Sequence, residues 1–225
     1  MGKKEVDFLI ENASEVITLQ GGSRRPLLGE QMKNLGIIKN GGVAVNQGKI
    51  VSVGKTREIK RKFEGKETLD VIGKVVMPGF VDPHTHLVFA GSREDEFEMR
   101  IQGFTYMEIF ERGGGILKTV RETRKTSSDE LTKSCKETLD VMLEHGTTTV
   151  EVKSGYGLTT SEEIKCLEVM KRLNKEHPID IVPTFLGAHA IPAEYKNNAD
   201  EYVSLLTNEM IPAVANRKLA EFCDV

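Results

Sequence analysis

The sequence predicts an α/β fold: a small β-rich unit, then about four βα units that form the N-terminal part of a (β/α)8 TIM barrel. The two parts of the chain differ in composition and pattern, and each supports this fold. Residues 1–76 combine β-type composition with glycine-containing turns. In residues 77–225, short apolar segments alternate with helical ones, which is typical of a parallel sheet. A complete barrel needs about 250 residues, so residues 77–225 are expected to be the first half of a truncated barrel.

The first unit, 1–76, is expected to be all-β. Three segments of β-type composition predict strands: 7–10, 15–19 and 69–76. The glycine pairs Gly21-Gly22 and Gly41-Gly42 predict turns. Residues 43–54 predict two strands joined by a tight turn at Asn46-Gln47-Gly48-Lys49. This segment contains no His and no Cys, so no metal site is expected in it.

The second unit predicts strands and helices in alternation. The strands are expected at 79–88, 147–153, 179–186 and 219–225, and the helices between them at 128–145, 161–176 and 197–216. Ser127 with Glu130, and Thr160 with Glu163, fit the capping-box pattern at two helix starts. His145, at a helix end before glycine, is expected to be structural, and His177 to face solvent.

Composition excludes several classes of protein. A net charge of −3 and a pI near 6.0 give no basic surface of the kind that binds nucleic acid. No apolar run approaches the ~18 residues of a membrane span, and the N-terminus lacks a secretory pattern. Three widely spaced cysteines argue against a disulfide framework. The sequence therefore predicts a cytoplasmic protein without nucleic-acid or membrane partners.

The strongest chemical signal is the His-Thr-His segment at His84 and His86. Alternate residues of a strand point to the same face, so the two imidazoles can reach one metal ion. In a barrel, the end of a strand faces the mouth where active sites are built. Imidazole nitrogens suit zinc and iron(II). The alternative is an incidental pair, but the preceding Pro-Gly-Phe-Val-Asp at 78–82 favours metal ligands.

These motifs resemble a known family. A Pro-Gly-x-Val-Asp-x-His-x-His segment after a β-rich leader resembles the amidohydrolase superfamily, and further segments resemble the imidazolonepropionase family within it. Those segments are DPHTHLVFAGSR at 82–93, YMEI at 106–109, GGGI at 113–116, EVKSGYGL at 151–158, LGAH at 186–189 and FCDV at 222–225. Their order and spacing extend the resemblance over nearly the whole chain.

The resemblance carries implications for fold and activity. It implies that residues 1–76 are the N-terminal strands of a composite β-sandwich and that the barrel holds one divalent or transition metal ion, zinc or iron. It also implies hydrolysis of the cyclic amide of a small-molecule substrate, 4-imidazolone-5-propanoate, to N-formimidoyl-L-glutamate. A homodimer is implied as well. Lys218 lies only at the edge of the fourth strand, which favours one metal ion over a pair bridged by a carboxylated lysine.

The resemblance further implies four substrate-binding residues: Arg93, Tyr156, His189 and Tyr106. A guanidinium such as that of Arg93 can grip the substrate's propionate with two hydrogen bonds, although a surface ion pair with Glu94 or Glu96 is the alternative. Tyr156 lies between glycines after the second strand, and His189 follows the third. Both could instead be structural residues at the barrel end.

No residue of this chain can be named as the general base. A catalytic zinc usually has at least three protein ligands, and the resemblance places a further His, a Glu and an Asp beyond Val225. Two other functions stay open. One is a different single-metal amidohydrolase, such as a nucleobase deaminase, which would share His84 and His86. The other is a non-catalytic fragment that lacks the second half of the active site.

Overall fold

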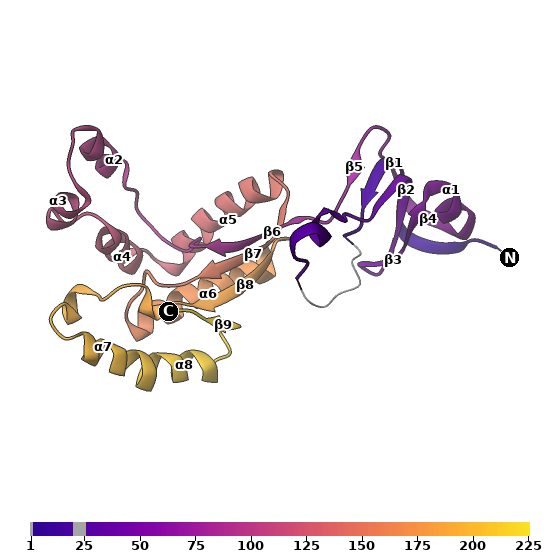
Figure 1. Ribbon diagram of the computed structural model, residues 1–225. Coiled ribbons are helices and arrows are strands. Elements are labelled where there is room, and N and C mark those ends of the chain that lie inside the picture. Colours follow the sequence, from indigo (N-terminus) through magenta and orange to yellow (C-terminus); the bar gives the residue numbers. More distant parts are fainter. Residues whose placement is uncertain (1, 20–25) are drawn as a thin grey trace. The chain divides into compact units, whose positions relative to one another are not determined.

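The computed structural model describes residues 2–19 and 26–225, and the chain divides into two compact units, Met1–Pro78 and Gly79–Val225 (Figure 1). The expected turn at Gly21-Gly22 lies outside the described residues. The sequence placed a domain boundary after residue 76, and the independence of the two units as domains stays a prediction.

The first unit is built on one five-stranded sheet. Its strands are β1 (Lys4–Ile17), β2 (Ile37–Asn46), β3 (Lys49–Lys55), β4 (Phe63–Asp70) and β5 (Val75–Val76). The order is β3-β2-β1-β4, with β5 also paired to β1. The two strands expected at 7–10 and 15–19 are one strand, because a bulge at Asn12 (φ 62°) bends β1 without ending it. The hairpin between β2 and β3 is confirmed, since Gln47 and Gly48 both have the positive φ of a tight turn.

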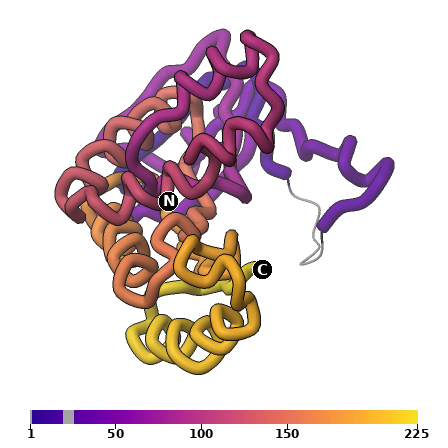
Figure 2. Tube along the Cα trace, turned by 90° about the vertical axis from the view of Figure 1, so that its left-hand side faces the viewer, coloured from indigo at the N-terminus to yellow at the C-terminus, as the bar shows by residue number. Residues whose placement is uncertain are grey.

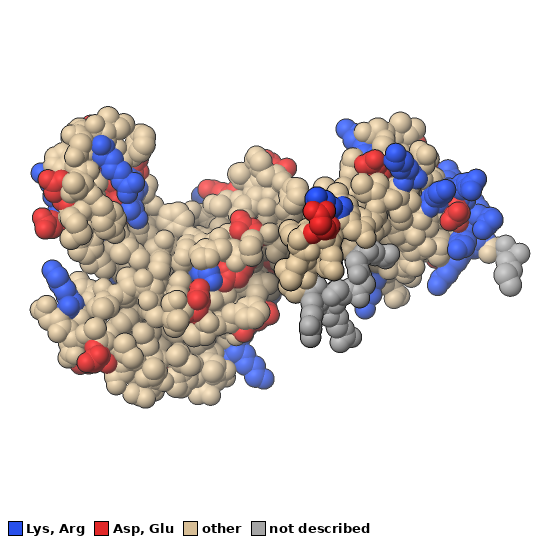
Figure 3. Space-filling view, in the orientation of Figure 1, with Lys and Arg blue, Asp and Glu red and all other residues tan. Residues whose placement is uncertain are grey.

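The prediction that the first unit is all-β is wrong. A short helix, α1 (Thr56–Lys62), lies between β3 and β4. The buried Thr56 hydroxyl accepts the Asn12 N–H at 2.9 Å and donates to the Gly41 carbonyl at 2.7 Å, which joins the helix start to the bulge. Lys and Arg side chains gather on the part of this unit that carries α1 (Figure 3).

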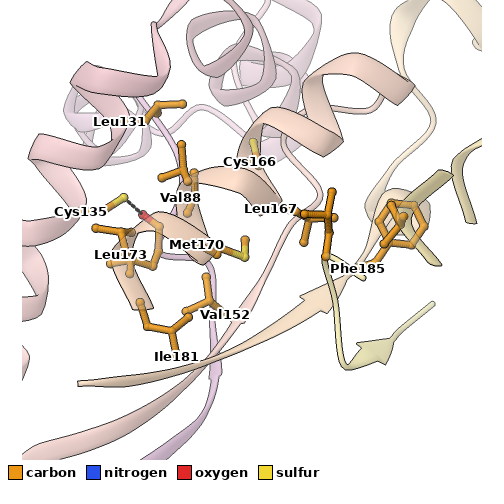
Figure 4. Close-up of a cluster of buried hydrophobic side chains, with 14 of the residues drawn as sticks. Val88, Leu131, Cys135, Val152, Cys166, Leu167, Met170, Leu173, Ile181 and Phe185 are labelled. Atoms are coloured by element: carbon orange, nitrogen blue, oxygen red, sulfur yellow. Dashed lines mark hydrogen bonds between the residues drawn. The ribbon is translucent and has the colours of Figure 1, made fainter. Parts of the chain in front are cut away.

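The second unit contains the predicted parallel sheet. Strands β6 (Phe80–Thr85), β7 (Thr147–Lys153), β8 (Asp180–Phe185) and β9 (Phe222–Cys223) follow that order, and every neighbouring pair is parallel. The long helices α5 (Ser128–Glu144) and α6 (Thr160–Glu176) pack on it. Their apolar side chains join those of the strands in one buried cluster (Figure 4). The predicted fold, the first part of a βα barrel, is confirmed.

Three further helices follow β6: α2 (Glu94–Ile101), α3 (Tyr106–Glu111) and α4 (Ile116–Lys125). The sequence did not predict them. The helix expected at 197–216 consists of α7 (Ala199–Leu205), a π-helical turn (Leu206–Met210) and α8 (Ile211–Asn216). Pro212 in α8 has no N–H to donate, and its ring crowds the preceding turn, which explains the π turn just before it. The α2–α4 and α7–α8 segments lie on opposite sides of this unit (Figure 2).

Local predictions in this unit have mixed outcomes. The Ser127–Glu130 capping box is confirmed, and His145 ends α5 with Nδ1 2.8 Å from the Val141 carbonyl. The Thr160–Glu163 box is wrong by one residue, because Thr159 is the cap and its side chain accepts the Glu162 N–H. The expectation that His177 faces solvent is also wrong. Its side chain is buried and lies 3.2 Å from Asp140.

Candidate functional site

The histidines and tyrosine that the sequence singled out meet at the carboxyl ends of three adjacent parallel strands. His84 lies at the end of β6 and His86 just after it, Tyr156 follows β7, and His189 lies in the turn Gly187–His189 after β8. The rings of His86 and His189 stack with centroids 4.5 Å apart. Tyr156 lies 5.3 Å from each of these rings, and His84 lies 5.8 Å from His86. We call His84, His86, Tyr156 and His189 the ring cluster.

The chemistry of His86 fits a metal ligand. Burial, and after it the neighbouring His189, His84 and Lys153, lower its pKa to about 4 against an opposing effect of Glu151, so the imidazole is neutral at pH 7. The neutral ring is the form that coordinates metals. Its Nδ1 is buried and lacks a hydrogen-bond partner within the described part of the chain. A lone pair without a partner is costly unless a ligand takes it up.

His84 is the second candidate ligand. It is exposed, and its backbone N–H contacts the Asp82 carboxylate at 3.3 Å. In residues 2–19 and 26–225, no group of three or more His, Cys, Asp or Glu side chains is arranged to hold a metal ion. The described residues therefore offer two histidines, fewer than the three protein ligands of a catalytic zinc site.

Three charged side chains lie beside the histidines. The buried Lys153 ammonium, at the end of β7, contacts Glu151 at 2.8 Å and Asp224 at 2.9 Å. Hydrogen bonds with Glu151 and then Asp224 raise the pKa of Lys153, and Lys153 holds the pKa of Asp224 below its usual range. This lysine therefore stays charged, and its positive charge favours the neutral form of His86.

Arg93 follows the first strand as expected and is paired with a carboxylate. Its Nε contacts Glu96 Oε2 at 2.9 Å, and the other oxygen of Glu96 accepts the Gly115 N–H at 2.7 Å. The ion pair named as the alternative for Arg93 is therefore present. It uses Nε, and in the described part of the chain the two terminal nitrogens have no hydrogen-bond partner. Arg93 also lies within electrostatic reach of Tyr156, where burial raises the phenol pKa and the guanidinium opposes that rise.

Tyr106 is not brought into the ring cluster. It is the first residue of α3, is 53% exposed, and stacks on Phe110 with centroids 6.5 Å apart. Among the described residues, its ring has no recorded contact with His84, His86, Tyr156 or His189. Its substrate role therefore rests on the resemblance alone.

Curated relatives match the chain along almost its whole length. "Imidazolonepropionase" of Geobacillus kaustophilus is 53% identical over 222 residues, which cover 97% of this chain and 52% of that protein. The proteins of the same name from Brevibacillus brevis and Alkaliphilus metalliredigens are each 51% identical, over 96% and 98% of this chain and 52% of their own lengths. The chain matches the N-terminal part of imidazolonepropionases. It spans about half the length of the curated relatives it matches.

Solved structures agree on the fold. An adenosine deaminase from Xanthomonas campestris with bound zinc has a TM-score of 0.54 at 16% identity and covers 95% of this chain and 53% of its own. A guanine deaminase from Bradyrhizobium japonicum has a TM-score of 0.51 at 16% identity and covers 94% of this chain and 41% of its own. No family model matches the chain. At these identities the similarity supports the βα barrel fold and says nothing of substrate.

Two residues that contribute to the site were missed by sequence reasoning. Glu96 and Glu163 are buried carboxylates. They accept backbone N–H groups of Gly115 and Gly157, which belong to two of the segments on which the resemblance rests. Glu96 was considered only as a surface partner of Arg93, and Glu163 only as part of a capping box. Neither role leaves a periodic signal in the sequence. Glu96 binds Gly115, 19 residues further along the chain, and Glu163 binds a loop five to eight residues before it.

Proposed function

We propose that this chain supplies part of the active site of a metal-dependent hydrolase that opens 4-imidazolone-5-propanoate to N-formimidoyl-L-glutamate in histidine degradation. The observation that carries the proposal is the match to imidazolonepropionases, 53% identity over 97% of this chain. The arrangement of the ring cluster supports it, because these four residues come from three separate strand ends and occupy the segments on which the resemblance rests.

His84 and His86 would hold one zinc or iron ion together with ligands from outside the described residues. A bound ion of this kind would supply Lewis acidity, which polarises a carbonyl and acidifies water. His86 is prepared for this task because its ring is neutral and its Nδ1 is unpartnered. None of the described residues is proposed as the general base.

His189 is held in one tautomer. Its Nδ1 lies 3.1 Å from the Gly155 carbonyl, which can only accept, so Nδ1 carries the proton. In the neutral ring Nε2 is then an acceptor. We infer that Nε2 accepts a hydrogen bond from a ring N–H of the substrate. Tyr156, which lies beside His189 and His86, would cover the flat imidazolone ring and offer its hydroxyl.

Arg93 would bind the propionate. Because Glu96 holds Nε, the terminal nitrogens are oriented together, and a planar guanidinium binds a carboxylate through such a pair. Tyr106 is proposed as a further substrate contact. The whole protein is proposed to be a cytoplasmic homodimer without nucleic-acid or membrane partners. No helix in the described part of the chain is long and apolar enough to span a bilayer.

A substrate panel tests this proposal. The protein expressed from its native gene is stripped of metal, reloaded with zinc or iron, and assayed on 4-imidazolone-5-propanoate, guanine and cytosine. We expect N-formimidoyl-L-glutamate to form and the nucleobases to be unchanged. Deamination of a nucleobase without imidazolone hydrolysis would support the alternative amidohydrolase. If none of the three compounds is converted, the chain would be better explained as a non-catalytic fragment.

A further inference from the structure

A single buried carboxylate organises the loop between β7 and α6. Oε1 of Glu163 accepts the N–H groups of Gly157 and Leu158, both at 2.8 Å, and Oε2 accepts the N–H of Gly155 at 3.1 Å. The side chain is completely buried. The mechanism above does not use this group, and the sequence assigned it only to a helix cap.

A carboxylate suits this place for a physical reason. Three backbone N–H groups of one short loop point inward, and each buried donor needs an acceptor. An ionised carboxylate offers about four lone-pair sites, so one residue can satisfy all three. Burial raises the pKa of Glu163, and hydrogen bonds from Ser154, Leu158, Gly157 and Gly155 oppose that rise.

The loop is held by Glu163 on both sides of Tyr156 and is joined to His189 through Gly155. The N–H groups of Gly155 and Gly157, which flank Tyr156, both end on Glu163. The carbonyl of Gly155 is the partner of His189 Nδ1. One peptide segment therefore connects Glu163 to the side chain that stacks on His86. Displacement of Gly155 would move the Tyr156 backbone and remove the acceptor that fixes the His189 tautomer.

We propose that Glu163 is a positioning residue: it holds the 155–158 loop so that Tyr156 and His189 lie beside His86. The consequence for catalysis rests on the proposed function, but the positioning itself does not. Glu163 contacts no substrate and carries out no chemical step. Its effect reaches the site through the Gly155 peptide.

Amide hydrogen exchange and imidazole NMR signals test this in the whole chain, without substrate or metal. The variants are Glu163→Ala and Glu163→Gln. The control is Glu168→Gln, on the same helix, where the exposed carboxylate pairs with Arg217. Glu163→Ala removes both acceptor oxygens and so all three hydrogen bonds. Exchange at residues 155, 157 and 158 should therefore rise about 10- to 100-fold.

Glu163→Gln gives a sharper pattern. Its one carbonyl oxygen can still serve Gly157 and Leu158, while its NH2 group faces the N–H of Gly155. Exchange at Gly155 should therefore rise about tenfold or more, with smaller changes at Gly157 and Leu158. The ring-proton shifts of His189 should change in this variant and stay constant in Glu168→Gln.

Two results would overturn the proposal. One is wild-type exchange at Gly155 together with unchanged His189 signals in Glu163→Gln. The other is an equal rise in exchange across the whole second unit, including β8, which would mean that Glu163 serves only global stability. If Glu163→Ala does not fold, the Gln variant decides. If the loop responds as expected but the native protein does not hydrolyse the imidazolone, only the proposed function fails.

Discussion

Gly155→Ala should destabilise the second unit and displace His189. Gly155 has a φ of +112°, which side-chain-bearing residues rarely adopt, and a Cβ there would lie 2.7 Å from the His189 Cβ and 2.8 Å from the Leu186 carbonyl oxygen. That oxygen accepts the His189 N–H at 3.1 Å within the turn, and His189 Nδ1 lies 3.1 Å from the Gly155 carbonyl. The turn therefore cannot move away from Gly155 without losing the second of these hydrogen bonds.

The magnitude follows from two separate costs. The unfavourable φ costs about 1–3 kcal/mol, and forcing a methyl group into packed atoms costs about 1–3 kcal/mol more. Gly103→Ala is the matched control, because Gly103 has a φ of +95° but no atom within 4 Å of its Cβ position. Gly103→Ala should therefore lose only the unfolding free energy that the unfavourable φ costs, about 1–3 kcal/mol.

Urea unfolding followed by tyrosine fluorescence measures this difference. The chain has no Trp, and its four tyrosines (Tyr106, Tyr156, Tyr195 and Tyr202) all lie in the second unit, so the signal reports on that unit. We expect Gly155→Ala to lose about 1–3 kcal/mol more than Gly103→Ala and to shift the His189 ring protons. Equal losses in both variants, with unshifted His189 signals, would refute the reasoning.

Three further predictions follow from contacts in the two units. Thr56→Val should cost about 1–3 kcal/mol of unfolding free energy in urea, because it takes the partner from the buried Gly41 carbonyl and the partly buried Asn12 N–H; an unchanged midpoint would contradict this. His86→Ala should weaken Zn²⁺ binding at least about tenfold in competition with a coloured chelator, whereas equal affinity would exclude this ligand. At pH 8 a thiol reagent should label Cys223 first, because burial raises the pKa of Cys135 to about 12 and that of Cys166 further still; faster labelling of either buried thiol would argue against their packing.

Sequence pattern predicted the elements in which local composition and burial agree. Strand β7 was predicted with its observed bounds, Thr147–Lys153, because β-branched residues run through it between a helix-ending glycine and a glycine-rich loop. Strand β9 is shorter than the expected 219–225, since only Phe222 and Cys223 pair with β8. The helix α1 was missed because seven residues rich in Lys and Arg show little apolar periodicity.

The residues of the candidate site also fall into those that the sequence could predict and those that it could not. His84, His86, Tyr156 and His189 could be found because strand ends of a parallel sheet share one edge, so a motif after each strand predicts a meeting place. Glu163 could not be found, because its role depends on the path of a loop that curls back over the first turn of α6. Hydrogen bonds from a helix side chain to a loop five to eight residues earlier leave no periodic trace in the sequence.

The most direct test of the account asks whether Arg93 recognises the substrate's carboxylate. The native protein, and its Arg93→Ala variant, are assayed on 4-imidazolone-5-propanoate and on the corresponding propanamide. We expect the wild-type protein to hydrolyse the propanoate with a kcat/KM about 10- to 100-fold above that for the propanamide, and the variant to treat both alike. Hydrolysis of both substrates at equal kcat/KM by the wild-type protein, or of neither, would contradict the account.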